Sequence, residues 1–219
     1  MLTIVEIIFL RIVKMPLFVT LCLSFGTAGT GGFGIKNDSI ASYSTYNQVV
    51  ITVFMILFGI NFNAYYLLLT KKVMQAAKNE EVRYYLGIIG LAIVAIAINT
   101  REMFTSFGRA FQQAAFQVGS IITTTGYATT DFNVWPVFSK TILVILMFVG
   151  ACAGSTGGGI KVSRVLILLK SVKKELKQYL HPSVVEKINM DGKLVEHEVV
   201  RSTNVFMVAY VLIFAVSVP

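Results

Sequence analysis

Ser120-Ile-Ile-Thr-Thr-Thr-Gly-Tyr-Ala-Thr-Thr-Asp131 is the stretch that decides how this chain folds. It follows an apolar helical run and places a glycine beside an aromatic residue among small side chains. A second copy of the pattern, Thr30-Gly-Gly-Phe-Gly34, lies upstream, also after apolar residues. Gly32 and Gly126 are 94 residues apart, which indicates an internal repeat. Because glycine adopts backbone conformations that other residues avoid, we expect both copies to be non-helical loops.

The composition is that of an integral membrane protein. Of the 219 residues, 55% are hydrophobic and 14% are charged, and the mean hydropathy is +0.73, whereas about 25% of the residues in soluble domains are charged. The net charge of +8 could suit nucleic acid, but the basic residues lie beside apolar segments, as in the loops of membrane proteins. We therefore expect an all-α polytopic membrane protein that contacts lipid and binds no nucleic acid.

Several other classes of protein are disfavoured. Cys22 and Cys152 lie among apolar residues, which favours free thiols over a disulfide. Arg11 and Lys14 interrupt the first apolar run and no cleavage site follows, so a signal peptide is not expected. The sequence has no metal-site spacing, and its apolar segments lack the convergent acid, base or metal groups of a membrane-embedded enzyme. We expect no enzyme activity and no cofactor.

The first 83 residues are expected to hold one partial repeat unit and a loop. No role is assigned to residues 1–14, which are too short and too interrupted for a secure spanning helix of about 20 residues. The expected parts of the unit over 1–70 are a short helix at 16–27, the first loop at 30–34 and a membrane helix at 49–69. A basic cytoplasmic loop follows at 71–83.

Residues 84–169 are expected to form the next unit. Its expected parts are a helix at 84–98, a short helix at 104–122, the second loop at 123–128 and an apolar run at 138–169. A basic cytoplasmic loop at 170–204 and the start of another membrane helix at 205–219 come after it.

The apolar run at 138–169 must break. As one helix of about 32 residues it would be roughly 48 Å long, but the hydrocarbon core is about 30 Å thick. We predict the break at Gly150 and at Gly154-Ser-Thr-Gly-Gly-Gly159, and call residues 150–159 the glycine loop. It is not a phosphate-binding loop, because Ile160 separates the last glycine from Lys161. Two interpretations of the glycine loop remain open: a mobile element and a rigid packing kink.

The basic residues also predict how residues 104–122 lie in the membrane. Lys and Arg mark cytoplasmic loops, and the two most basic stretches are 71–83 and 161–201. A full crossing by residues 104–122 would place these stretches on opposite sides. If the helix instead enters from the outer face and returns to it, both basic stretches are cytoplasmic. They carry 13 of the 19 Lys and Arg residues. We therefore predict a re-entrant helix, followed by irregular backbone inside the membrane.

Two known patterns resemble these motifs. Thr124-Thr-Gly-Tyr-Ala128 is similar in residue classes to the Thr-Val-Gly-Tyr-Gly filter of potassium channels, whose carbonyl oxygens replace the hydration shell of a cation. Five segments resemble Trk/Ktr-type bacterial potassium transporters, and are closest to the TrkH and TrkG subunits. They are Ser24–Gly34, Asn61-Phe62, Phe116–Asp131, Trp135-Pro136 and Gly150–Val162. Since this family has four such units per chain, we expect a fragment with the second, the third and the start of the fourth.

The resemblance implies uptake of potassium through a carbonyl-lined filter in the bacterial inner membrane, as a channel or by symport. Backbone oxygens of eight residues would bind the ion: Thr30, Gly31, Gly32, Phe33, Thr124, Thr125, Gly126 and Tyr127. The glycine loop would be the gate, with Gly150, Gly154, Ser155, Thr156, Gly157, Gly158 and Gly159 as the gate residues. Potassium is then the substrate.

The resemblance also implies partners. These are a second copy of the chain in a homodimer and a cytosolic nucleotide-binding regulatory subunit of the TrkA type, docked on basic loops such as 170–201. Two other functions stay open: a translocator permeable to both sodium and potassium, and a non-conducting structural or truncated subunit. Asp38 and Asp131 either concentrate cations or are solvated loop residues. We expect Gln112, Gln113 and Gln117 to brace the second loop.

Overall fold

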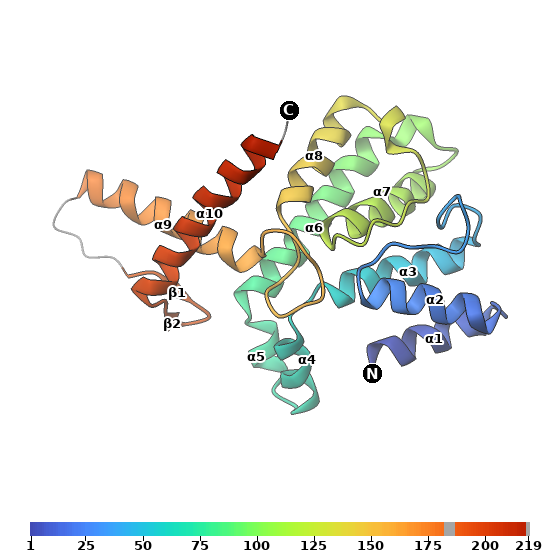
Figure 1. Ribbon diagram of the computed structural model, residues 1–219, viewed down its shortest axis with the longest axis horizontal. Helices are drawn as coiled ribbons and strands as arrows, with labels where there is room; N and C mark the ends of the chain where they lie inside the picture. The colour runs from blue at the N-terminus through green and yellow to red at the C-terminus, as the bar shows by residue number, and fades with distance from the viewer. Residues whose placement is uncertain (182–186, 218–219) are drawn as a thin grey trace.

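The chain folds as a set of helices joined by irregular loops. The computed structural model describes residues 1–181 and 187–217, and within them only one short hairpin is strand. Figure 1 shows two helical groups, one formed by the first 60 residues or so (blue) and one by the middle of the chain (green to yellow). The last two helices lie to one side of these groups. The prediction of an all-α fold is confirmed.

The first group consists of three helices that pack around a shared apolar core. They are α1 (Leu2–Ile12), α2 (Leu17–Ala28) and α3 (Thr45–Phe58). Leu23, Ile51 and Met55 are fully buried between them. α2 follows Pro16, whose missing N–H is not needed at a helix start. At 12 residues and about 18 Å, α2 is too short to cross a bilayer core of about 30 Å.

The second group repeats this arrangement, and its first two helices are longer than those of the first group. They are α6 (Glu80–Asn99), α7 (Phe107–Ile122) and α8 (Val137–Phe148). α7 packs against both α6 and α3, so it joins the two groups. The 16 residues of α7 reach about 24 Å, again short of a full crossing. α6 begins four residues before the predicted start, because the side chain of Asn79 accepts a hydrogen bond from the N–H of Val82 at 3.0 Å.

The prediction of one continuous membrane helix over 49–69 is wrong. The segment forms α3 and a separate helix, α4 (Phe62–Leu69), and the two are bent by 92°. The side-chain oxygen of Asn61 accepts a hydrogen bond from the N–H of Asn63 at 2.8 Å and so caps α4. Hydropathy alone could not show this break, because every residue near it except the two asparagines is apolar or glycine.

The backbone groups freed by this break bind the glycine loop. The N–H of Cys152 donates to the carbonyl of Gly59 at 3.0 Å, and the N–H of Phe62 donates to the carbonyl of Gly154 at 3.0 Å. Because unpaired backbone groups are costly inside a membrane, the break between α3 and α4 and the break at the glycine loop stabilise each other.

The C-terminal part differs from the predicted basic loop at 170–204. Helix α9 (Val162–Leu180) extends into it, and α10 (His197–Ser217) begins eight residues before the predicted start at 205. Lys, Glu and Leu are strong helix formers, which explains why the polar residues after 170 stay helical. A short antiparallel hairpin, β1 (Asn189–Met190) and β2 (Lys193–Leu194), precedes α10.

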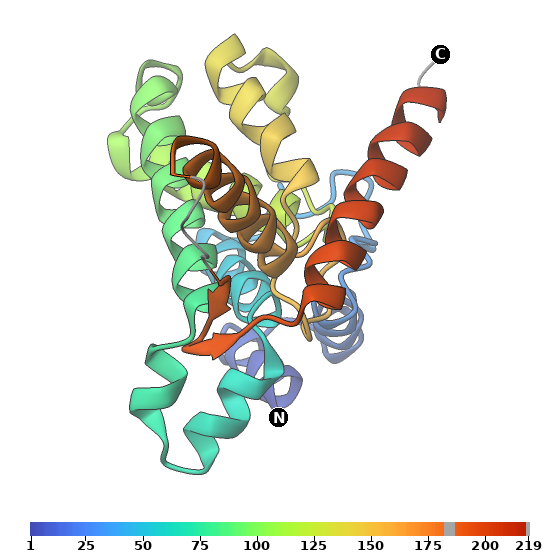
Figure 2. The same ribbon diagram turned by 90° about the vertical axis from the view of Figure 1, so that its left-hand side faces the viewer.

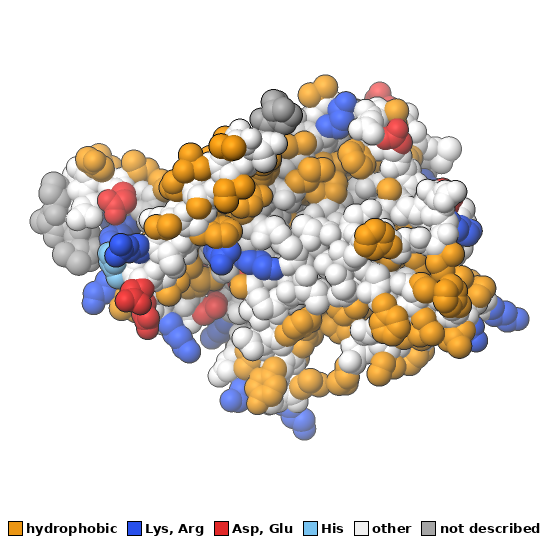
Figure 3. Space-filling model, in the orientation of Figure 1, with side chains coloured by type: hydrophobic (Ala, Val, Ile, Leu, Met, Phe, Trp, Pro, Cys, Tyr) orange, Lys and Arg blue, Asp and Glu red, His pale blue; other side chains and the backbone are white. Residues whose placement is uncertain are grey.

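The apolar surfaces fit a membrane environment. Among the described helices, α6 and α10 are long and apolar enough to cross a membrane. Figure 2 shows α10 extending away from the two groups, and Figure 3 shows hydrophobic side chains gathered along it. A second hydrophobic area covers the lower right of the same face, over the first group. The middle of this face, over the glycine loop, is mostly backbone and neutral polar atoms.

Candidate functional site

The two repeated loops have the same unusual backbone conformation. Thr30 and Thr124 have φ angles of 50° and 58°, and Gly32 and Gly126 have φ angles of 66° and 88°. A β-branched residue in this left-handed region is strained and rare, yet it occurs at the same place in both copies. The residue between each threonine and glycine lies outside this left-handed region. When left-handed residues alternate with residues of other conformation, the successive peptide groups of the loop turn toward the same side of the chain.

Equivalent hydrogen bonds hold both loops to the helices before them. The N–H of Gly31 donates to the carbonyl of Gly26 at 2.8 Å, and the N–H of Thr125 donates to the carbonyl of Ser120 at 2.9 Å. A second pair of bonds is also repeated: Thr30 to Thr27 at 3.2 Å and Thr124 to Ile121 at 3.0 Å. Every partner is 94 residues from its counterpart. The repeat seen in the sequence is therefore present in the backbone.

The loops are also in direct contact with each other. A β-carbon on Gly32 would collide with the carbonyl oxygen of Thr125, so only glycine allows this approach. Ala128, at the end of the second loop, is fixed to the segment after the first. Its carbonyl accepts a hydrogen bond from the N–H of Ile40 at 3.0 Å, and its N–H donates to the hydroxyl of Ser39 at 3.2 Å.

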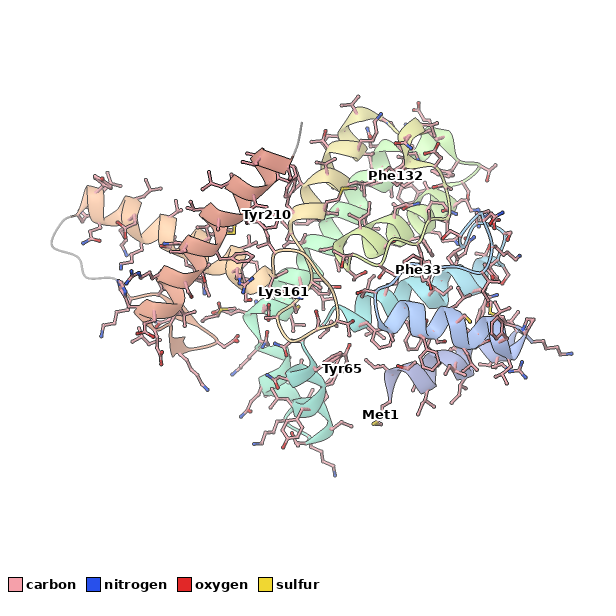
Figure 4. All side chains as sticks on the ribbon, viewed as in Figure 1. Met1, Phe33, Tyr65, Phe132, Lys161 and Tyr210 are labelled. Carbon is pink, nitrogen blue, oxygen red and sulfur yellow. The ribbon has the colours of Figure 1, made fainter. Side chains whose placement is uncertain are left out.

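The aromatic residues of the two loops lie in different environments. Tyr127 is 1% exposed and its hydroxyl donates to the carbonyl of Leu23 in α2 at 3.3 Å. Because Gly26 has no side chain, it leaves room for this hydroxyl group. Phe33, at the equivalent position and labelled in Figure 4, is 84% exposed. Tyr127 therefore packs against the preceding unit, whereas no described helix covers Phe33.

We expect Gly26→Ala to destabilise the protein by about 1–3 kcal/mol, because the added β-carbon would overlap the hydroxyl oxygen of Tyr127. The next nearest ring atom would be 3.4 Å away, an ordinary contact. Adding Tyr127→Phe, which removes the overlapping oxygen, should restore part of the loss. Thermal unfolding of the purified protein in detergent measures both effects. Equal melting temperatures for G26A and G26A/Y127F would contradict this contact.

The side chains around the second loop leave some of its main chain open. The hydroxyl of Ser120 donates to the carbonyl of Tyr127 at 2.6 Å, so one lone pair of that oxygen remains for another partner. The hydroxyls of Thr123 and Thr125 share a hydrogen bond at 2.7 Å. No described atom lies within 4 Å of the place where a β-carbon on Gly126 would stand. Gly126 therefore faces open space.

The glycine loop lies against both repeated loops. The N–H of Gly158 donates to the hydroxyl of Thr124 at 2.7 Å, and the hydroxyl of Thr30 donates to the carbonyl of Thr156 at 3.3 Å. α8 ends at Phe148 and α9 starts at Val162, and a backbone bridge between Val149 and Ile160 closes the loop between them. In Figure 1 this loop lies between the two helical groups.

Glycines are required for this close packing. A β-carbon on Gly157 would stand 2.5 Å from the β-carbon of Ala151 and 3.1 Å from the carbonyl oxygen of Thr123. A β-carbon on Gly150 would collide with the carbonyl of Gly158 across the neck of the loop.

Polar residues of α7 hold the segment after the second loop. The amide of Gln117 donates to the carbonyl of Thr130 at 3.0 Å, and the side chain of Gln113 accepts a hydrogen bond from Thr129. Bracing by these two residues thus acts just beyond the second loop. Gln112 instead donates to Gln48 of α3 at 2.9 Å. The carboxylate of Asp131 caps a short 3-10 helix, Phe132–Val134.

Sequence reasoning missed Glu81. This residue is 3% exposed, and one of its carboxylate oxygens accepts hydrogen bonds from Ala153 in the glycine loop and from Ser163 just after it. An acidic residue in the first turn of a helix is common because it offsets the helix dipole. The sequence therefore carried no signal of this contact, whose partners are 72 and 82 positions away.

Main-chain dipoles contribute negative potential at the repeated loops. In the described residues no group of three or more His, Cys, Asp or Glu could hold a metal ion. The helices α2 and α7 both end at a repeated loop, so the negative ends of their dipoles lie near its carbonyls.

Comparisons with known proteins agree with this geometry. The model of the TrkH family, a family described as cation transport protein, matches residues 2–219. The Trk system potassium uptake protein TrkH of Escherichia coli K12 is 31% identical over 207 residues, which are 93% of this chain and 43% of the relative. TrkG of the same strain is 33% identical over 210 residues, with 92% and 42% covered.

A solved structure supports the same assignment. The crystal structure of the potassium transporter TrkH from Vibrio parahaemolyticus matches 98% of this chain with a TM-score of 0.91 and 33% identity. The match covers 47% of that chain, so this sequence spans less than half the length of the relatives it matches. With its two repeated loops, its broken helices and its apolar surface, this multi-pass membrane protein belongs to the TrkH family of cation transport proteins.

Proposed function

We propose that this chain forms part of a potassium uptake path in the bacterial inner membrane. The first and second loops supply the selectivity filter, and the glycine loop is the gate. One observation carries the proposal: two loops with the same left-handed backbone lie in contact, and the glycine loop is hydrogen-bonded to both. The names of the relatives, Trk system potassium uptake proteins, supply the ion.

Binding of the ion uses main-chain oxygens of the eight predicted residues. They are Thr30, Gly31, Gly32, Phe33, Thr124, Thr125, Gly126 and Tyr127. Carbonyl dipoles replace the hydration shell of potassium without adding a fixed negative charge, so the ion can enter and leave. At Tyr127 one lone pair is used by Ser120, and the other serves the ion.

Two loops do not enclose a cation, since such rings need about four members. The exposed ring of Phe33 supports a neighbouring unit before the first loop, placed as α2 is placed beside Tyr127. Further units supplied by the complete gene product would close the ring. The homodimer proposed from the resemblance is then a separate association of two such proteins.

The gate and its partner follow from the position of the glycine loop. α9 starts directly after this loop, so a protein that moves α9 also moves the gate. Lys173 and Lys174 lie on α9 and suit the docking of a cytosolic nucleotide-binding subunit of the TrkA type. This subunit would open or close the path through α9.

Reconstitution tests the proposal. The complete gene product is placed in liposomes, and potassium and sodium fluxes are measured under equal gradients. Potassium flux well above sodium flux supports a selective filter. Equal fluxes favour the translocator permeable to both ions, and no flux, with or without the regulatory subunit, favours the non-conducting subunit.

A further inference from the structure

The buried carboxylate of Glu81 joins the glycine loop to the helix that follows it. Its Oε1 atom accepts a hydrogen bond from the N–H of Ala153 at 2.6 Å and from the N–H of Ser163 at 3.1 Å. Ala153 lies in the first part of the loop, and Ser163 lies in the first turn of α9 just after it. One oxygen atom thus ties the first part of the loop to the start of α9.

The second oxygen connects a third segment. Oε2 of Glu81 accepts a hydrogen bond from the side-chain amide of Asn61 at 3.4 Å, and Asn61 stands at the break between α3 and α4. Both oxygens therefore accept hydrogen bonds, as the two oxygens of a carboxylate can. Hydrogen bonds to an ionised group are the stronger class, and burial strengthens them further.

Positive charge around Glu81 fits this role. α9 has no side-chain cap of its own, because its N-cap position is Lys161, so Glu81 supplies the missing acceptor from α6. The ammonium of Lys161 interacts electrostatically with Glu81 and donates a hydrogen bond to the carbonyl of Gly157 inside the loop. In Figure 4 Lys161 lies beside this loop. An acidic group at the positive end of a helix is stabilising.

We propose that Glu81 is a positioning residue that latches the glycine loop against the two filter loops. This inference rests on the proposed function, in which the loop is a gate. The contacts of the loop with Thr30 and Thr124 are hydrogen bonds between neutral groups, whereas those with Glu81 involve a charge. The carboxylate therefore adds a charged anchor to these neutral contacts.

The test is Glu81→Gln in the complete gene product, with Glu80→Gln as the matched control. The glutamine side chain has nearly the same shape as glutamate and keeps one acceptor oxygen, but it lacks the charge. Glu80 is the preceding residue and pairs with Lys170 of α9, so the control removes one link between α6 and α9 and leaves the hydrogen bonds of Glu81 to the loop. Potassium flux into liposomes without the regulatory subunit should rise about tenfold for E81Q, equivalent to about 1.4 kcal/mol. For E80Q it should stay within about twofold of the wild type.

Hydrogen exchange provides a second measurement that needs no transport. Amides of residues 150–160 should exchange about tenfold faster in E81Q and at the wild-type rate in E80Q. Faster exchange in a protein that passes no ions would support the latch and count against the proposed function. Wild-type exchange and flux in E81Q would overturn the latch and leave the filter proposal intact. Loss of E81Q from the membrane would also overturn it, because Glu81 would then be needed for folding.

Discussion

Gly126→Asp in the complete gene product is expected to reduce potassium uptake by more than about 100-fold. The side chain has room, since no described atom lies within 4 Å of the added β-carbon, and aspartate tolerates left-handed backbone better than most residues. The protein should therefore fold. The change instead places a carboxylate beside carbonyls that bind the ion only weakly, and a conducting site must release its ion.

Uptake is measured as growth of a potassium-uptake-deficient bacterium at low potassium and as initial flux. Gly192→Asp is the matched control. Gly192 also has a positive φ, 74°, and open space around it, but it lies in the β1–β2 hairpin, outside the proposed path. The control should support normal growth. Rescue by both G126D and G192D would remove the filter hypothesis.

Gly157→Ala should open the gate in the absence of the regulatory subunit. The added methyl group would overlap Ala151 and approach the carbonyl of Thr123 at 3.1 Å, so the glycine loop cannot keep its position beside the second loop. Overpacking of this kind costs about 1–3 kcal/mol, which corresponds to an increase of roughly 5- to 150-fold in the open population.

Rubidium uptake in cells that lack the regulatory subunit measures this effect. Gly87→Ala makes the same chemical change in α6, where no described atom lies within 4 Å of the added β-carbon, and should leave uptake unchanged. Wild-type uptake in G157A, with normal amounts of protein in the membrane, would show that the loop is a packing kink and not a gate.

Much of the fold could be predicted because its signals are local. The repeat at a spacing of 94 residues, the loops after two short helices and the break near Gly150 depend on hydropathy, helix length and the backbone freedom of glycine. Each of these properties acts over a few neighbouring residues. The structure shows the repeat in the φ angles of Thr30 and Thr124 and in hydrogen bonds at the same spacing.

The sequence could not predict features that depend on distant partners. The bend at Asn61 exists because the glycine loop, which lies far along the chain, takes up the freed backbone groups. The boundary at 205 was wrong because it rested on the first apolar run, whereas α10 already starts among polar residues at His197. These errors share one cause, since hydropathy does not report which backbone groups find partners.

The candidate site also combines local features, which the sequence predicts, with features that depend on distant partners. By itself the sequence determined a membrane protein of helices with two glycine-containing loops and a broken helix, because apolar length and glycine content constrain each segment on its own. Only the tertiary structure decided that Tyr127 is buried against α2 while Phe33 is exposed, and that Glu81 holds the glycine loop. The physical reason is that burial and hydrogen bonding belong to pairs of segments, and their pairing is fixed only when the whole chain has packed.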